Sequence, residues 1–353
     1  HLDEVEARLL KTHSHLFSPH KCVEAVRACS LPIAEGLRVE RQAFEECMKT
    51  PQRAGLIHAF FGERAVSNVP ESKIAPRQVE HIGIIGAGTM GSGIATACLL
   101  AGLRVTLIES VQDNLTKGAA TIERNLQGAV KRGKLQAENL SKTQSLLQPA
   151  SDIEALDQVD MVIEAAFEDM DVKKEIFKKL DNVCKAEAVL ASNTSYLDIN
   201  EIAAITSRPQ DVIGLHFFSP AHVMRLLEIV VGKQTDTAVT ATGFALAKKL
   251  RKIGVKAGVC DGFIGNRILA HYRKTAAYLV LDGAHPQQVD QALENFGFAM
   301  GPHKVTDLAG LDIDWMTRKR TAATRPKEER SPGDIAVRSC ERGWFGRKSG
   351  KGY

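Results

Sequence analysis

Two residues whose types suit proton transfer, His216 and Glu228, lie in the segment HFFSPAHVMRLLE. This segment directly follows a predicted strand, and ligands of open α/β sheets bind beyond the carboxyl ends of the strands. Oxidation of an alcohol requires a base that takes the hydroxyl proton, and a histidine side chain titrates near neutral pH. A carboxylate beside the ring would orient it and stabilise the imidazolium. A histidine among aromatic residues is more often a packed structural residue, so the residue types alone leave both interpretations open.

A second segment, GAGTMG at positions 86–91, has the spacing of a dinucleotide-binding turn. In a G-x-G-x-x-G motif the first glycine, Gly86 here, allows the tight turn. The second, Gly88, lets a pyrophosphate approach the backbone, and the third, Gly91, lets the helix pack against the strand. The motif alone is a weak signal. Here an apolar strand precedes it and a predicted helix follows it, which is the context that a nucleotide site requires.

Three further residues extend this predicted cofactor site. Thr89 and Met90 open the predicted helix, whose free N–H groups would bind the phosphates. Glu109 closes the next strand, 18 residues after Gly91. A carboxylate there accepts hydrogen bonds from the adenosine ribose and repels a 2′-phosphate, which favours NAD over NADP. The alternative for Glu109 is a surface residue with no cofactor role.

Alternating strands and helices must position these residues, which predicts an α/β fold with a Rossmann-type, doubly wound and mostly parallel sheet. We expect a helical arm and linker over residues 1–78, a nucleotide-binding domain over 79–257 and an all-helical domain over 258–353. The predicted strands are Ile82–Gly86, Arg104–Glu109, Met161–Glu164, Ala188–Ala191 and Val212–Leu215, with the strands ending after Lys256. The predicted helices include Thr89–Ala101, 112–132, Val172–Lys185, Gly262–Asp282, Pro286–Phe296 and Val305–Lys319.

Composition limits the remaining function classes. Hydrophobic residues make up 44% and charged residues 25% of the 353 residues, as in ordinary globular proteins, and no apolar run predicts a membrane span. The seven cysteines form no C-x-x-C pair, so neither a zinc site nor a disulfide framework is expected. Between positions 317 and 351, eleven Lys or Arg face four Asp or Glu. Interleaved aromatic residues are few there, so we expect an anionic ligand or a solvated surface and no nucleic acid.

Several motifs in the same order resemble the 3-hydroxyacyl-CoA dehydrogenase family of fatty-acid β-oxidation, particularly the dehydrogenase part of the multifunctional hydratase/dehydrogenases. The family's H-F-F-x-P…M-x-L-x-E element stands at His216–Glu228, its N-T-S element at Asn193–Ser195 and its G-F-x-x-N-R element at Gly262–Arg267. The resemblance covers about Val79 to Tyr353. Residues 1–75 more weakly resemble the helical linker that follows the hydratase module in those enzymes.

The resemblance implies roles for individual residues. His216 would be the catalytic base with Glu228 as its partner, and Ser195 and Asn266 would bind the reacting oxygen of the substrate. The stretch from Glu164 to Lys173 resembles family positions beside the NAD ribose and nicotinamide. By resemblance, the cofactor contacts in this stretch are Glu168 and Lys173, and Asn193 and Ser219 lie at further contact positions. Without the resemblance, Lys173 would be interpreted as one solvated lysine among several. Ser219 departs from the asparagine that some members of the family carry at this position.

Three functional hypotheses follow. The leading one is an L-3-hydroxyacyl-CoA dehydrogenase that oxidises the β-hydroxyl to a ketone with NAD. A related β-hydroxyacid dehydrogenase, acting on a free acid, would be expected to carry a catalytic lysine or an arginine clamp instead. A noncatalytic NAD- or acyl-CoA-binding fragment would not need His216, Glu228, Ser195 and Asn266 together.

The resemblance also implies partners and a compartment. The helical domain looks like the first of two repeats, with the chain ending before a second, so its apolar face is expected to pair with another copy as a homodimer. The enzyme would be cytoplasmic in a bacterium and peroxisomal in a eukaryote. Acyl chain length is not readable from these residues.

Overall fold

The computed structural model describes residues 1–321, 330–331, 333 and 335–353. Part of the basic segment 317–351 therefore lies outside the described residues. The chain divides into two compact units, one formed by residues 54–266 and the other by residues 1–53 and 267–353. The predicted domain boundaries at 78 and 257 stay predictions.

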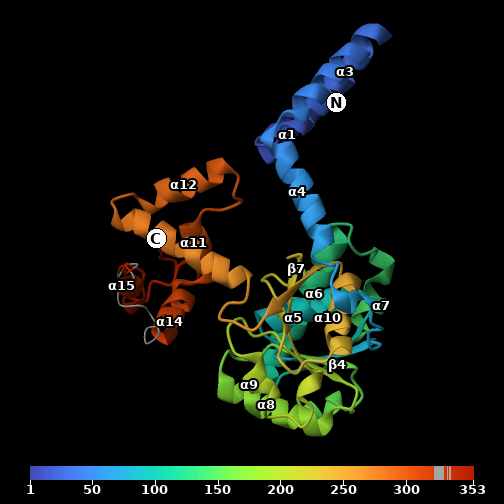
Figure 1. Cartoon of the computed structure of the whole chain (residues 1–353), viewed down its shortest axis with the longest axis vertical. Coiled ribbons are helices and arrows are strands. Elements are labelled where there is room, and N and C mark those ends of the chain that lie inside the picture. Colours follow the sequence, from blue (N-terminus) through green and yellow to red (C-terminus); the bar gives the residue numbers. More distant parts are fainter. Residues whose placement is uncertain (322–329, 332, 334) are drawn as a thin grey trace. The chain divides into compact units, whose positions relative to one another are not determined.

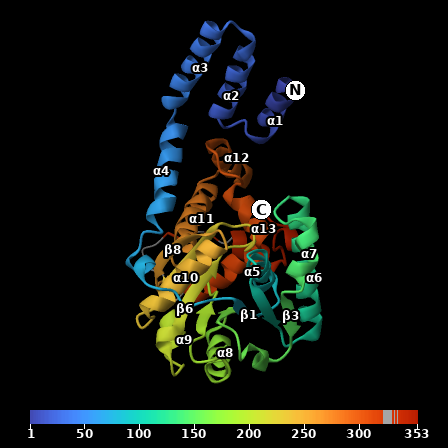
Figure 2. The same ribbon diagram turned by 90° about the vertical axis from the view of Figure 1, so that its right-hand side faces the viewer.

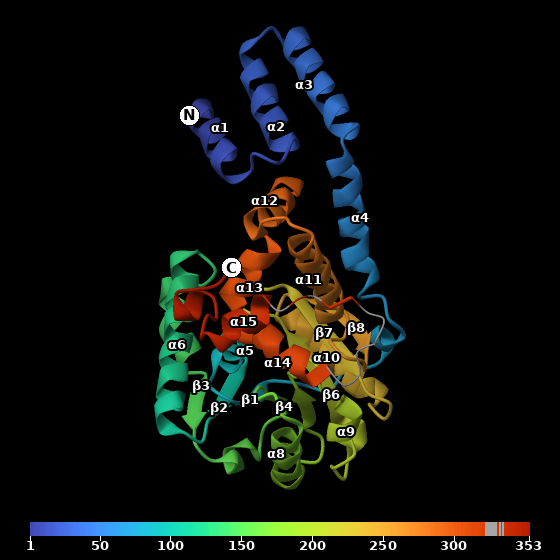
Figure 3. The ribbon, with the colours of Figure 1, turned by 90° about the vertical axis from the view of Figure 1, so that its left-hand side faces the viewer.

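The unit 54–266 is built on one eight-stranded sheet with the order β3-β2-β1-β4-β5-β6-β7-β8. Figure 3 shows β3, β2, β1 and β4 side by side in that order. Every neighbouring pair is parallel except β6 and β7, which confirms the predicted, mostly parallel sheet. The strands are β1 His81–Ile85, β2 Arg104–Ile108, β3 Leu147–Ala150, β4 Met161–Glu164, β5 Val189–Ser192, β6 Val212–Phe217, β7 Leu226–Val231 and β8 Ile253–Gly258.

Helices cover both faces of this sheet, as a doubly wound fold requires. Apolar side chains of α5 (Thr89–Leu100), α6 (Gln112–Lys131) and α10 (Thr237–Lys249) form one hydrophobic core with the sheet. Those of α8 (Met170–Val183) and α9 (Ile199–Ala203), which lie together in Figure 2, form the core on the other face. The short α7 spans Leu140–Gln144. Strands β4, β5 and β6 are buried along their whole length, which explains why they read as continuous apolar runs.

The sequence predictions were wrong in three places. Strand β3 was missed because Gln148 and Pro149 interrupt the apolar pattern, and such residues are tolerated at a sheet edge. Strand β8 was missed as well, and strand structure continues to Gly258. The single helix predicted over Val305–Lys319 is two helices, α13 (Pro302–Ala309) and α14 (Leu311–Thr321). Gly310 separates them with a φ of 109°, a conformation that glycine adopts without strain.

The remaining elements are helical. The arm, blue in Figure 1, contains α1 Leu2–Thr12, α2 Ser18–Arg27, α3 Ile33–Met48 and α4 Pro51–Ala65. The C-terminal part contains α11 Gly265–Leu281, α12 Pro286–Phe296, α13, α14 and α15 Ile335–Glu341. The described part of the chain holds no helix with both the length and the apolar character needed to span a membrane.

The linker that precedes β1 is fixed to the sheet unit. The Arg77 guanidinium donates to Asp211 at 2.6 Å and to the Glu187 carbonyl at 3.0 Å. Glu71, which is 7% exposed, pairs with Lys256 on β8. These contacts explain why the linker belongs to the same compact unit as the sheet.

Candidate functional site

The glycine-rich turn between β1 and α5 has a geometry that only small residues allow. Gly86 has a φ of 98°, and a Cβ there would lie 2.7 Å from the Ala165 carbonyl oxygen. A Cβ on Gly91 would lie 1.7 Å from the Gly86 carbonyl oxygen, so the helix can approach the turn only with glycine at this position. A Cβ on Gly88 would meet no atom within 4 Å. Gly88 therefore faces open space, where a pyrophosphate can approach the backbone.

The N-terminus of α5 opens beside this space. Gly88 is the N-cap, and no side chain among the described residues caps the helix, so the N–H groups of Thr89 and Met90 are available to an anion. One cavity of about 640 Å³ borders Gly88, Thr89, Lys117 and His222. The structure thus fits a dinucleotide at the predicted turn.

Glu109 lies where the sequence places it, at the end of β2 beside the turn. Its Oε2 accepts from the Ala87 N–H and its Oε1 from the Val111 N–H, both at 3.2 Å. It borders the first cavity and also a second one of about 810 Å³, which Gly86 and Phe167 help to line. The half-buried carboxylate can therefore accept hydrogen bonds from a ligand lying across the turn.

His216 and Glu228 face each other across the antiparallel strands β6 and β7, where they occupy directly opposite positions. His216 Nδ1 lies 2.6 Å from Glu228 Oε2, and the residues are 3% and 0% exposed. The predicted pairing of the side chains is therefore present. The other carboxylate oxygen, Oε1, accepts from the N–H groups of Ile264 at 3.0 Å and Gly265 at 2.7 Å.

Two aromatic rings lie close to the imidazole. The ring centroids of His216 and Phe218 lie 4.5 Å apart, and those of His216 and Phe263 lie 5.6 Å apart. Close approach of Phe218 to the start of α11 depends on glycine, because a Cβ on Gly265 would lie 2.8 Å from its ring. With Nδ1 engaged by Glu228, Nε2 is the nitrogen that remains for a ligand.

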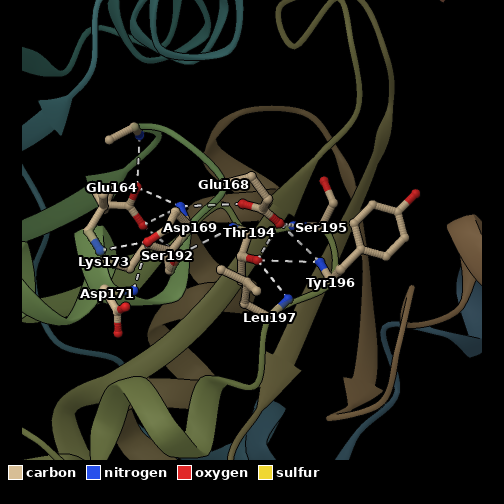
Figure 4. A network of polar contacts seen from close by, with 12 residues as sticks. Glu164, Glu168, Asp169, Asp171, Lys173, Ser192, Thr194, Ser195, Tyr196 and Leu197 are labelled. Carbon is tan, nitrogen blue, oxygen red and sulfur yellow. Dashed lines mark hydrogen bonds and ion pairs between the residues drawn. The ribbon is translucent and has the colours of Figure 1, made fainter. Parts of the chain in front are cut away.

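A network of polar contacts joins the ends of β4 and β5 (Figure 4). Lys173 is 1% exposed, so the alternative of a solvated lysine is wrong. Its ammonium donates to both oxygens of Glu164, at 2.7 and 2.9 Å, and lies 3.4 Å from Glu168 Oε2. Glu168 Oε1 accepts from Thr194 Oγ1 at 2.6 Å and from the Ser195 N–H at 2.7 Å. Direct contact of Lys173 with a cofactor stays a prediction.

The other predicted site residues lie on the loops around this edge of the sheet. Asn193 Oδ1 accepts from the Phe217 N–H at 2.9 Å, which ties the end of β5 to the end of β6. Ser195 follows on the same turn and is half-buried. Ser219 is exposed on the loop after β6, and Asn266 is half-buried in the first turn of α11, next to Gly265. The structure thus brings the predicted residues, from the segments after β4, β5 and β6 and from the start of α11, into one unit.

Sequence reasoning missed Lys252, which holds the loop between β6 and β7. Its ammonium donates to the carbonyl oxygens of Ala221 and Met224, both at 2.7 Å. Burial lowers the pKa of Lys252, while the Cys98 thiol opposes this shift. No motif marks this lysine, because its partners are backbone carbonyls.

Among the described residues, no three or more His, Cys, Asp or Glu residues are grouped to hold a metal ion.

Comparison with known proteins decides the family. Residues 81–260 match the NAD-binding domain of 3-hydroxyacyl-CoA dehydrogenase, and residues 262–353 match its C-terminal domain. The chain belongs to the 3-hydroxyacyl-CoA dehydrogenase family. The resemblance inferred from the motifs is thereby confirmed, and NAD is the cofactor that the matched domain binds.

Relatives within the family include the peroxisomal bifunctional enzyme of Danio rerio, which is 39% identical over 96% of this chain and 49% of its own length. The chain therefore spans about half the length of such relatives. The crystal structure of FadB2 from M. tuberculosis is 37% identical with a TM-score of 0.74, over 78% of this chain and 98% of that one. That of (S)-3-hydroxybutyryl-CoA dehydrogenase from Ralstonia eutropha is 34% identical with a TM-score of 0.72, over the same shares.

Proposed function

We propose that this chain oxidises L-3-hydroxyacyl-CoA to 3-ketoacyl-CoA with NAD in fatty-acid β-oxidation. The observation that carries the proposal is the buried pair of His216 and Glu228 at 2.6 Å, in the same unit as the glycine-rich turn. Relatives named for 3-hydroxyacyl-CoA substrates support the acyl-CoA class over a free hydroxyacid.

In this proposal His216 takes the proton of the substrate hydroxyl at Nε2. Glu228 holds the Nδ1–H, which fixes the tautomer that leaves Nε2 unprotonated, and it stabilises the imidazolium that forms. Burial of the pair strengthens this interaction, because few waters screen it. Bound NAD supplies the hydride acceptor.

Ser195 and Asn266 are proposed to bind the reacting oxygen. A hydroxyl and an amide N–H can both donate to an oxygen that gains negative character as its proton leaves. The backbone of Ser195 is held by Glu168 at 2.7 Å, so its side chain projects from a fixed turn. Asn266 lies in the first turn of α11, whose first residue, Gly265, donates to Glu228, and this contact couples the position of Asn266 to the base.

The cofactor is proposed to lie across the glycine-rich turn. Its pyrophosphate would bind Gly88, Thr89 and Met90, and its adenosine ribose would bind Glu109. Glu168, with 38% of its side chain exposed, would contact the nicotinamide half. Asn193 and Ser219 would complete that half, and Lys173 would contribute at least by holding Glu168.

The test is NADH formation from an L-3-hydroxyacyl-CoA and NAD, with the wild type and the His216→Ala variant. We expect turnover in the wild type and a loss of about 10³-fold or more in the variant, with unchanged NAD affinity. A wild type that binds NAD but does not turn over this substrate would refute the proposal. So would a His216→Ala variant with undiminished turnover.

We also propose the wider setting of the enzyme. A homodimer through the C-terminal helices is supported by large exposed apolar side chains there, including Ile268 at 66%, Phe296 at 82% and Met316 at 58% exposure. A monomer in sedimentation experiments, with full turnover, would contradict this.

In a eukaryotic source the peroxisome is the proposed compartment, given the peroxisomal relatives, and in a bacterium the cytoplasm. For a eukaryotic source, microscopy of a tagged full-length protein would show whether it enters the peroxisome.

A further inference from the structure

The buried ion pair of Glu164 and Lys173 has no part in the proposed proton transfer. Glu164 is 0% exposed and Lys173 is 1% exposed. Burying two charges carries a large desolvation cost before their attraction compensates for it, and apolar side chains of similar volume often serve stability as well. The pair sits at the carboxyl ends of β4 and β5, the edge of an α/β sheet where ligands bind.

The hydrogen bonds that the Glu164 carboxylate accepts come from residues at or after the ends of β4 and β5. Its Oε1 accepts from the Ala166 N–H at 2.8 Å and from Lys173 at 2.7 Å. Its Oε2 accepts from Lys173 at 2.9 Å and from Ser192 Oγ at 2.7 Å. Ser192 lies directly opposite on β5, and its Oγ in turn accepts from the Thr194 N–H at 3.2 Å. The Ser192 hydroxyl thus links the Glu164 carboxylate to the backbone of the turn after β5.

A second route reaches the same turn through Lys173. The ammonium lies 3.4 Å from Glu168 Oε2. The other oxygen of Glu168 accepts from the Thr194 hydroxyl and from the N–H groups of Ser195 and Tyr196, at 2.6, 2.7 and 3.2 Å. Figure 4 shows both routes converging on this turn. Neutralising Glu164 would leave the ammonium with Glu168 alone, which would pull that carboxylate away from the turn.

We propose that Glu164 is a positioning residue for the reaction: through Lys173, Glu168 and Ser192 it fixes the turn that presents Ser195 to the substrate oxygen. The inference rests on the proposed function for the role of Ser195. It rests on the structure alone for the fixation of the turn. The two parts are therefore measured separately.

The first experiment measures amide hydrogen exchange of residues 193–197 in the full chain, comparing the wild type with Glu164→Gln. We expect exchange at least about tenfold faster in the variant, because donors held by Glu168 are released. The matched control is Asp181→Asn, which removes a carboxylate from α8, the helix that carries Lys173. Asp181 pairs there with Arg208 at 3.3 Å and accepts from the Ser207 N–H. This variant should leave exchange at 193–197 unchanged. Unchanged exchange in Glu164→Gln would overturn the proposal, whatever the substrate.

The second experiment measures kcat in a cycle of Glu164→Gln and Ser195→Ala. A misplacement of the turn by about 1 Å is expected to lower kcat about 100-fold when Ser195 is present. In the Ser195→Ala background the same change should cost less than about threefold, because the group it positions is already gone. A full 100-fold loss in both backgrounds would overturn the role through Ser195.

A double variant separates positioning from folding. Glu164→Leu with Lys173→Met removes both buried charges and should keep a thermal midpoint near that of the wild type. The proposal expects its kcat to stay at least about tenfold low, since neither route to the turn remains. A double variant with wild-type kcat and wild-type exchange at 193–197 would show that the pair serves stability alone. Failure of wild-type turnover would refute the proposed function, while the exchange result would still decide the positioning.

Discussion

Replacing Glu228 by glutamine keeps the shape of the side chain but reverses what it can offer to His216. The carboxylate accepts from Nδ1 through one oxygen and from the Ile264 and Gly265 N–H groups through the other. A glutamine amide has only one oxygen. If that oxygen keeps the two backbone donors, the amide NH₂ faces Nδ1 and selects the tautomer with the proton on Nε2, which cannot act as the base.

The opposite amide orientation would preserve the active tautomer at a calculable cost. It turns the NH₂ toward the N–H groups of Ile264 and Gly265, and each of these part-buried donors loses its acceptor at a cost of about 1–3 kcal/mol. The active orientation is therefore disfavoured by about 2–6 kcal/mol, which corresponds to a loss in kcat of about 30-fold to 10⁴-fold at 1.36 kcal/mol per factor of ten. Loss of the negative charge beside the imidazolium pushes the result toward the upper value.

The assay is kcat for oxidation of an L-3-hydroxyacyl-CoA, with NAD affinity and the thermal midpoint measured on the same samples. The matched control is Asp290→Asn in the C-terminal helices, where Asp290 and His303 form a second buried pair at 3.1 Å. That variant should lower the thermal midpoint yet leave kcat per folded molecule within about threefold. A Glu228→Gln enzyme that retains more than a tenth of wild-type kcat would refute the tautomer argument.

Three further outcomes are expected. Gly88→Ala should fold normally but bind NAD at least about tenfold more weakly in calorimetry, because its methyl group occupies the open side of the turn. Gly91→Ala should instead lower the thermal midpoint, because its Cβ would meet the Gly86 carbonyl oxygen. Burial tends to raise the pKa of Asp160, but Lys185 and two backbone N–H groups outweigh it and hold the pKa below its usual value. The stability that Asp160 contributes is thus fully present above the pKa of the unfolded state and is lost as the pH falls through the pKa of the folded state. In denaturant titrations, Asp160→Asn should lower the free energy of unfolding by about 1–3 kcal/mol near neutral pH and by less in acid. Lys252→Met should lower kcat/KM about tenfold by releasing the loop after β6, without changing binding of NAD analogues that lack the nicotinamide; undiminished kcat/KM would contradict this.

Much of the sheet unit could be predicted because its signals are local. Each central strand is buried on both faces and so reads as a short apolar run, and the glycine spacing depends on contacts within the turn itself. The pairing of His216 with Glu228 stayed open from the residue types alone and was indicated by the family motif. In the structure the antiparallel register of β6 and β7 places the two residues opposite each other. The edge strand β3 could not be found this way, since its apolar pattern is broken.

Lys173 shows why the rest of the site could not be predicted. Its sequence neighbours include Lys174, Lys178 and Lys179, and nothing in that run distinguishes a buried ammonium from solvated ones. The distinction arises from Glu164 on a strand and Glu168 after it, which meet the helix only in the folded chain. A buried charge is tolerated only where partners from other elements converge, and such convergence leaves no periodic trace in the sequence. Burial of one lysine among several is therefore itself a reason to look for a function in the groups that it holds.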